Sequence, residues 1–154
     1  MRLTSSNILG CAVALAISCA SLAARADDAI GQVKTAKGDV KVQHKNQPAG
    51  PLKVGDHVAQ SDIVLTGPGS SVGITFTDNS MMSLGSNSKL ALDLYRFDPT
   101  THVGVFNTSL SKGTLAAKSG QIVEQTPEAM HVSTPAALLG VRGTEFVVRV
   151  EGQS

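Results

Sequence analysis

The chain has few cysteine and aromatic residues, and its basic residues are not clustered. Only two of its 154 residues are cysteine, and both, Cys11 and Cys19, lie within the first 26 residues. It has no tryptophan, one tyrosine and four phenylalanines, so we expect most aromatic side chains to pack in the core. Lysine and arginine are not clustered, which argues against binding to nucleic acid. After residue 26 no long helical stretch occurs, and we expect no transmembrane segment in that part of the chain.

The first 26 residues resemble a secretory signal sequence. Arg2 supplies a positive start, and residues 8–17 form an apolar run that is too short to span a membrane. Ala24-Arg25-Ala26 then gives the small-x-small pattern that signal peptidase recognises. We therefore predict a signal peptide at 1–26 and a mature domain at 27–154, located in the periplasm of a bacterium or secreted from it.

Cleavage after Ala26 would change both the charge and the thiol content. Without Arg2 and Arg25, 11 basic residues remain against 12 acidic ones, a formal net charge of −1. No cysteine would remain for a disulfide, although the compartment permits one. An alternative is cleavage before Cys19, where Ala16-Ile17-Ser18-Cys19 vaguely resembles a lipoprotein box with Ala in place of the usual Leu. A lipid on Cys19 would tether the domain to a membrane.

The rest of the chain is typical of short strands separated by glycine-rich turns. Val72, Ile74 and Phe76 alternate with small or polar residues, and Asp78-Asn79-Ser80 turns the chain into a return strand. Residues 36–38 predict a hairpin between the first two strands. The predicted strands are 30–35, 39–44, 72–77, 81–84, 89–95, 103–110, 112–118 and 145–150, with Met82, Leu84, Leu90, Leu92 and Leu94 facing inward.

These features predict an all-β protein. Glycine-marked turns about every ten residues favour an irregular β-sandwich or a β-solenoid-like single domain, and no exact internal repeat supports a regular solenoid. Residues 136–139 are the one place where the sequence allows a helical turn, because Pro135 suits a first helical position.

Histidine gives no metal site by spacing. His44, His57, His102 and His131 lie in unrelated segments, without i,i+2 or i,i+4 pairs and without a cysteine partner. A structural or solvated role is the simpler interpretation for each. We expect no metal and no cofactor.

The acidic residues allow a hydrolytic interpretation that a simpler one outweighs. Asp56, Asp62 and Asp78 could form a carboxylate cluster, but each lies in a glycine- or serine-rich turn, where Asp commonly bonds to its own backbone. No Gly-x-Ser-x-Gly motif and no phosphate-binding loop occurs. We therefore expect no catalytic residues and predict that the protein is not an enzyme.

Residues 134–150 form the most distinctive segment. Thr134-Pro135 favours extended backbone, and Gly140 and Gly143 bracket a single cation, Arg142, just before an alternating strand. The Arg142 guanidinium could hold a partner's carboxylate, or it could reach carbonyls or an acid of its own chain. We favour the internal role and leave the other open. The candidate interaction residues are Thr134, Pro135, Gly140, Arg142, Gly143 and Thr144.

The segments 134–136 and 140–146 resemble the closing motif of the FecR domain family. Asn79 stands where the family usually has Gly, and Asn tolerates the left-handed conformation of that turn. The resemblance implies a periplasmic all-β domain known from iron-siderophore signalling. In that system a membrane-spanning regulator links an outer-membrane receptor to a sigma factor. The segments that resemble the opening half of the family, in the same order, are 52–56, 62–67, 71–80 and 84–88.

The chain is expected to depart from that plan. We expect a signal peptide where the regulators have a sigma-binding segment and a transmembrane helix, and, since the sequence ends at Ser154, no receptor-contacting module. We therefore do not expect sigma regulation across the membrane by this chain alone. We expect an exported protein-protein interaction or signalling-accessory module of the cell envelope. It would bind a protein partner through its β-surface or a strand edge. The alternative is a peptidoglycan or envelope polysaccharide binder, against which the scarcity of aromatic residues stands.

Overall fold

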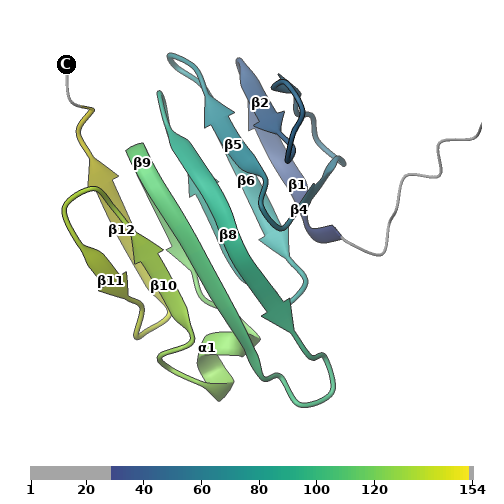
Figure 1. The fold of residues 1–154 in the computed structure, drawn as a ribbon, viewed down its shortest axis with the longest axis vertical. Coiled ribbons are helices and arrows are strands. Elements are labelled where there is room, and N and C mark those ends of the chain that lie inside the picture. The colour runs from purple at the N-terminus through teal and green to yellow at the C-terminus, as the bar shows by residue number, and fades with distance from the viewer. Residues whose placement is uncertain (1–28, 153–154) are drawn as a thin grey trace, which may run out of the picture.

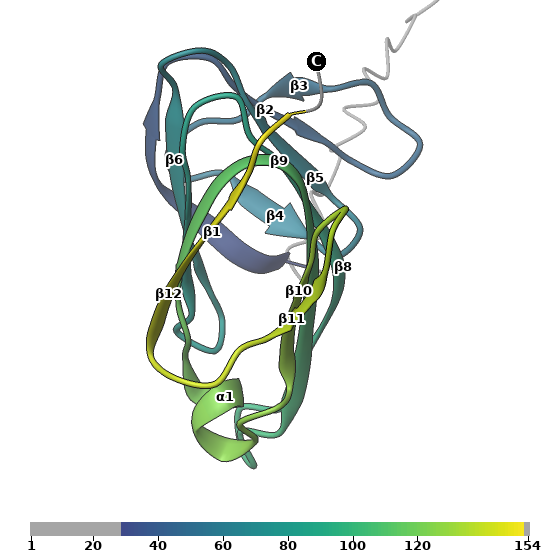
Figure 2. The same cartoon turned by 90° about the vertical axis from the view of Figure 1, so that its left-hand side faces the viewer.

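The computed structural model describes residues 29–152, and in it twelve strands form one sheet that curls into two facing layers (Figures 1 and 2). The all-β prediction is confirmed. The predicted signal peptide and Cys19 lie outside the described residues. Within residues 29–152 no helix is long and apolar enough to cross a membrane. The strands are β1 (Ala29–Lys37), β2 (Val40–Gln43), β3 (Gly50–Pro51), β4 (His57–Ala59), β5 (Ile63–Thr66), β6 (Ser71–Phe76), β7 (Met81–Leu84), β8 (Lys89–Phe97), β9 (Gly104–Lys118), β10 (Met130–Ser133), β11 (Leu138–Gly140) and β12 (Glu145–Val150).

One strand, β9, belongs to both layers. Its first part pairs with β8 and, in parallel, with β10, while residues 113–118 pair with β12 and 115–118 with β7. The two strands predicted at 103–110 and 112–118 are therefore one. Gly113, at φ +94°, lies where the two parts meet, and Figure 2 shows β9 arching from one layer to the other. We call the layer with β1, β4, β6, β7 and β12 the first layer, and the layer with β2, β3, β5, β8, β10 and β11 the second layer.

The hairpin predicted at 36–38 is wrong. β1 pairs with β4 and β6 in the first layer, whereas β2 pairs with β3 and β5 in the second. Gly38 does turn the chain, at φ +77°, but the turn carries it from one layer to the other. The Ser70 hydroxyl fixes this crossing because it accepts a hydrogen bond from the Asp39 N–H at 2.8 Å.

The hairpin of β6 and β7 is confirmed, with Ile74 opposite Met82. Asn79 has φ +65°, the left-handed conformation expected for the residue that replaces Gly. Val72, Ile74 and Phe76 are buried between the layers, as are Met82 and Leu84. Local alternation therefore predicted this part of the core correctly.

Strand β8 departs from simple alternation. Leu90 and Leu92 are buried as predicted, but Leu94 is only half-buried, and Tyr95 takes the inward position. The register with β9 shifts between Ala91 and Leu94, and such a bulge reverses the faces of the residues that follow it. The Tyr95 ring then packs edge-on against Phe106, with ring centroids 4.8 Å apart, and lies near Phe76.

The helical turn predicted at 136–139 is also wrong. The Thr134 N–H donates to the Ala137 carbonyl at 2.8 Å, and the Thr134 hydroxyl accepts from the Ala137 N–H at 3.1 Å. This closed turn returns the chain as β11, which pairs with β10, instead of starting a helix. The helix of the described chain is α1 (Gln121–Gln125), which buries Ile122 and Val123.

Candidate functional site at the open end of the sheet

The structure brings the six candidate interaction residues to one end of the molecule. This end, which we call the open end, is formed by β11 in the second layer and β12 in the first, and it faces the viewer in Figure 2. The candidates lie in the turn before β11 (Thr134 and Pro135), at the end of β11 (Gly140), and in the connection to β12 (Arg142, Gly143 and Thr144).

Both strands of the open end have one unpaired edge in the described part of the chain. β11 pairs with β10 alone, and β12 pairs with β9 alone. Their outer N–H and C=O groups are therefore available to another strand. A hollow of about 600 Å³ lies between the two strands, lined in part by Pro135, Leu139, Val148 and Val150.

The connection from β11 to β12 is tied to the end of β9. Val141 is buried, and its N–H donates to the Met130 carbonyl at 2.9 Å. Gly143, at φ +127°, offers its carbonyl to the Ser119 hydroxyl at 2.6 Å, and the Thr144 carbonyl accepts from the Ser119 N–H at 2.9 Å. The backbone that carries Arg142 is therefore held on both sides.

The Arg142 guanidinium forms an ion pair with Glu128, an acid of its own chain. The two side chains are 71% and 66% exposed. Exposed pairs of this kind stabilise a fold little, because water competes for both charges. Whether Arg142 braces the chain or contacts a partner therefore stays a prediction.

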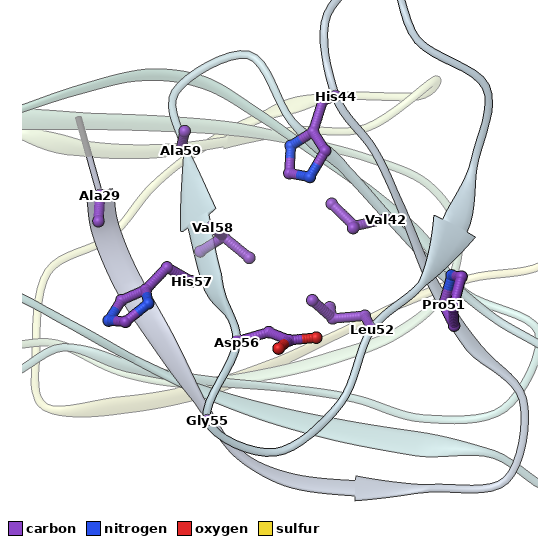
Figure 3. Close-up of a pocket in the computed structure, with 10 residues that line it drawn as sticks. All are labelled: Ala29, Val42, His44, Pro51, Leu52, Gly55, Asp56, His57, Val58 and Ala59. Carbon is purple, nitrogen blue, oxygen red and sulfur yellow. The ribbon is translucent and has the colours of Figure 1, made fainter. Parts of the chain in front are cut away.

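A second hollow, of about 410 Å³, lies beside β1, β2 and β4 (Figure 3). His44, which directly follows β2, and His57, in β4, both line it, and the His44 Nδ1 lies 2.8 Å from the Asp62 Oδ1. Asp56, also in the lining, accepts a hydrogen bond from the Lys53 N–H. Across residues 29–152 no three His, Cys, Asp or Glu side chains gather in a group that could hold a metal ion.

The three aspartates weighed as a hydrolytic cluster occupy separate turns. Asp56, Asp62 and Asp78 each accept a hydrogen bond from a backbone N–H two or three residues away, as the turn interpretation predicts. Asp78 does more than the sequence indicated. It is fully buried, and its carboxylate also accepts hydrogen bonds from the Ser80 hydroxyl at 2.6 Å and the Tyr95 hydroxyl at 3.2 Å.

Tyr95 gives this buried cluster a measurable pH dependence. Burial raises the pKa of Tyr95 above its ordinary value of 10.0, and the nearby Asp78 charge acts in the same direction. The folded protein favours the neutral Tyr95 hydroxyl, so this group stabilises the fold at pH values below the pKa of Tyr95 in the unfolded chain. The contribution is lost as the pH rises from that value towards the higher pKa of the folded protein. We expect the free energy of unfolding to fall above pH ~10 by up to about 1.4 kcal/mol per pH unit.

The check is urea unfolding of the native chain and Tyr95→Phe over a series of alkaline pH values. The native chain should lose stability more steeply, since the two chains differ only in the Tyr95 hydroxyl. Tyr95 is the one tyrosine and tryptophan is absent, so tyrosinate absorbance reports this hydroxyl alone. Ionisation of the folded protein at the ordinary tyrosine pKa, with parallel stability curves, would contradict the prediction.

The fold is that of an all-β module with the six candidate interaction residues at its open end, within and on either side of β11. A family model described as "FecR protein" matches residues 62–154, more than half of the chain. The chain therefore belongs to the FecR family, a family of regulatory proteins, which makes it a signalling-related protein of the bacterial cell envelope. No curated protein and no solved structure matches the chain. Strands β1–β4 lie before the matched region, yet β1 pairs with β6 and β2 pairs with β5 inside it.

Proposed function

We propose that this chain is an exported, non-enzymatic signalling module that binds another protein of the cell envelope. The contact that we assign to this partner is the connection of residues 141–144, with Arg142 at its centre. The exposed ion pair of Arg142 with Glu128 is the observation that carries the proposal.

The geometry supports exchange of Glu128 for a carboxylate of the partner. Hydrogen bonds from Ser119 to Gly143 and Thr144 hold the backbone beside Arg142, so little ordering is needed on binding. A guanidinium can bind a carboxylate through two parallel hydrogen bonds. Because the internal pair is exposed, its loss costs little stability.

The aromatic residues support the protein partner over a polysaccharide. Phe76, Tyr95 and Phe106 are buried against one another. Phe97 stacks on His102, with ring centroids 6.1 Å apart, and Phe146 is half-buried between the layers. These positions leave little flat aromatic surface for a sugar ring.

The test is cross-linking of the tagged full chain in cells, with captured partners identified by mass spectrometry. Arg142→Ala should lose a discrete protein partner that the native chain captures. Glu128→Ala is the matched control, because it breaks the same ion pair but keeps the guanidinium, and it should retain capture. Thermal unfolding of both variants should shift by only a few degrees, as expected for a loss of less than about 1 kcal/mol.

Three results would contradict the proposal. Equal capture by Arg142→Ala would remove Arg142 from the contact. If Arg142→Ala unfolds and Glu128→Ala does not, Arg142 is a structural brace. Retention of the native chain on isolated cell wall, without a protein partner, would favour the polysaccharide-binding alternative.

A further inference from the structure

We propose that the free edge of β12 pairs with β12 of a second copy of this chain, antiparallel and centred on Val147. The pairing would make a symmetric dimer. The proposal does not rest on the proposed partner contact, because Arg142 lies in the connection before the strand and not on the strand itself.

The edge is regular and unprotected. All six residues of β12 pair with β9 without a register shift, from Glu145 opposite Lys118 to Val150 opposite Gly113. Soluble proteins usually block an exposed edge with proline, a bulge or charged side chains. β12 has no proline and no bulge, and its two charged residues, Glu145 and Arg149, are of opposite sign, so they do not exclude a second β12. Val147 between them faces outward and is 70% exposed.

The charges of β12 are complementary to a second β12. Its exposed residues are Glu145, Val147 and Arg149. An antiparallel pair centred on Val147 places each Glu145 opposite Arg149 of the other copy, and the two Val147 side chains opposite each other. Opposite charges at facing positions stabilise a strand pair, whereas like charges destabilise it.

Neighbouring registers lose this match. A shift that places Val147 opposite Arg149 brings Glu145 opposite the exposed Glu151 of the other copy. The opposite shift places Glu145 opposite Val147 and leaves Arg149 without an acid. A parallel in-register pair would set Glu145 against Glu145 and Arg149 against Arg149. The charge pattern therefore selects one register.

The same symmetry covers the apolar side of the open end. Phe146 of one copy faces Val148 of the other, on the side of β12 that lines the gap between the layers. The two-fold axis of this dimer is perpendicular to the first layer, so the second layers of the two copies lie on the same side of the joined first layers. The β11 edges of the two copies then also approach each other. Leu138 and Leu139, which are 67% and 36% exposed, would then be covered.

Sedimentation equilibrium of the full chain tests the proposal through a charge exchange. The native chain should dimerise. Glu145→Arg and Arg149→Glu should each raise the dimer dissociation constant at least tenfold, because each brings like charges together at both facing positions. An equimolar mixture of the two variants should form a heterodimer, since the all-basic and all-acidic strands are then complementary.

Two further variants separate pairing from folding. Val147→Lys places two cations opposite each other at an exposed position and should also dissociate the dimer, with the thermal midpoint nearly unchanged. Lys41→Glu reverses a charge on β2, outside the open end, and should leave the dimer intact. A native chain that stays monomeric would overturn the proposal, as would a mixture that does not recover association. Either result leaves the partner captured through Arg142 unaffected, so the two proposals fail separately.

Discussion

Gly113→Ala is expected to lower the free energy of unfolding by about 3 kcal/mol or more, since overpacking adds to backbone strain. A Cβ at this position would lie 2.4 Å from the Ser88 Cα, and Gly113 has φ +94°. Ser88 cannot move aside easily. It is buried, and its hydroxyl accepts from the Thr114 N–H at 3.0 Å and donates to the Gly85 carbonyl at 3.0 Å.

Urea unfolding monitored by circular dichroism would measure this loss. Gly69→Ala is the matched control, because Gly69 also has a positive φ, +64°, but an added Cβ would have no neighbour within 4 Å. It should cost only the backbone term, about 1–2 kcal/mol. Equal losses in the two variants would show that close contact with Ser88 does not restrict position 113.

Asp78→Ala is expected to cost about 3 kcal/mol, because it leaves buried donors without an acceptor. The Asp78 carboxylate accepts hydrogen bonds from the Ser80 N–H, the Ser80 hydroxyl and the Tyr95 hydroxyl. The Ser80 hydroxyl in turn accepts from the Gly120 N–H at 3.0 Å. The side chain therefore links the β6–β7 turn to β8 and to the start of α1.

The matching measurement compares three variants by urea unfolding. Asp78→Asn keeps the shape and one acceptor oxygen, so its loss should be smaller than that of Asp78→Ala. Asp56→Ala removes the same kind of turn bond, to the Lys53 N–H, at an exposed site and should cost less than about 1 kcal/mol. A loss at Asp78 no larger than at Asp56 would refute a bridging role for the buried carboxylate.

The sequence predicted those parts of the fold that neighbouring residues determine. Alternation from Val72 to Leu84, with a turn at Asn79, is a local signal, and it identified both strands, their inward faces and their pairing. Around Gly38 the glycine indicated a turn correctly. Which strands pair across that turn depends on β5 and β6, which lie more than twenty residues away, so no local pattern could exclude a hairpin.

The candidate site was predictable to the same extent. The six candidate interaction residues are close in sequence, and the structure places them at one end of the sheet. The Arg142–Glu128 ion pair joins residues from different segments, and the spacing of these residues in the sequence did not indicate that they pair. The burial of Asp78 was missed because the bulge in β8 that brings Tyr95 inward cannot be read from alternation. A single tyrosine in an apolar strand was the available hint, since a buried hydroxyl needs a partner.

The path of β9 through both layers has a consequence for how the protein opens. In an ordinary two-layer sandwich one sheet can unfold locally while the other stays folded. The amides of the two sheets then exchange with solvent at different rates. Here one unbroken strand from Gly104 to Lys118 supplies backbone partners to strands of both layers. Detaching it exposes both layers at once. The molecule should therefore behave as one cooperative unit, with its slowest-exchanging amides running along the length of this strand.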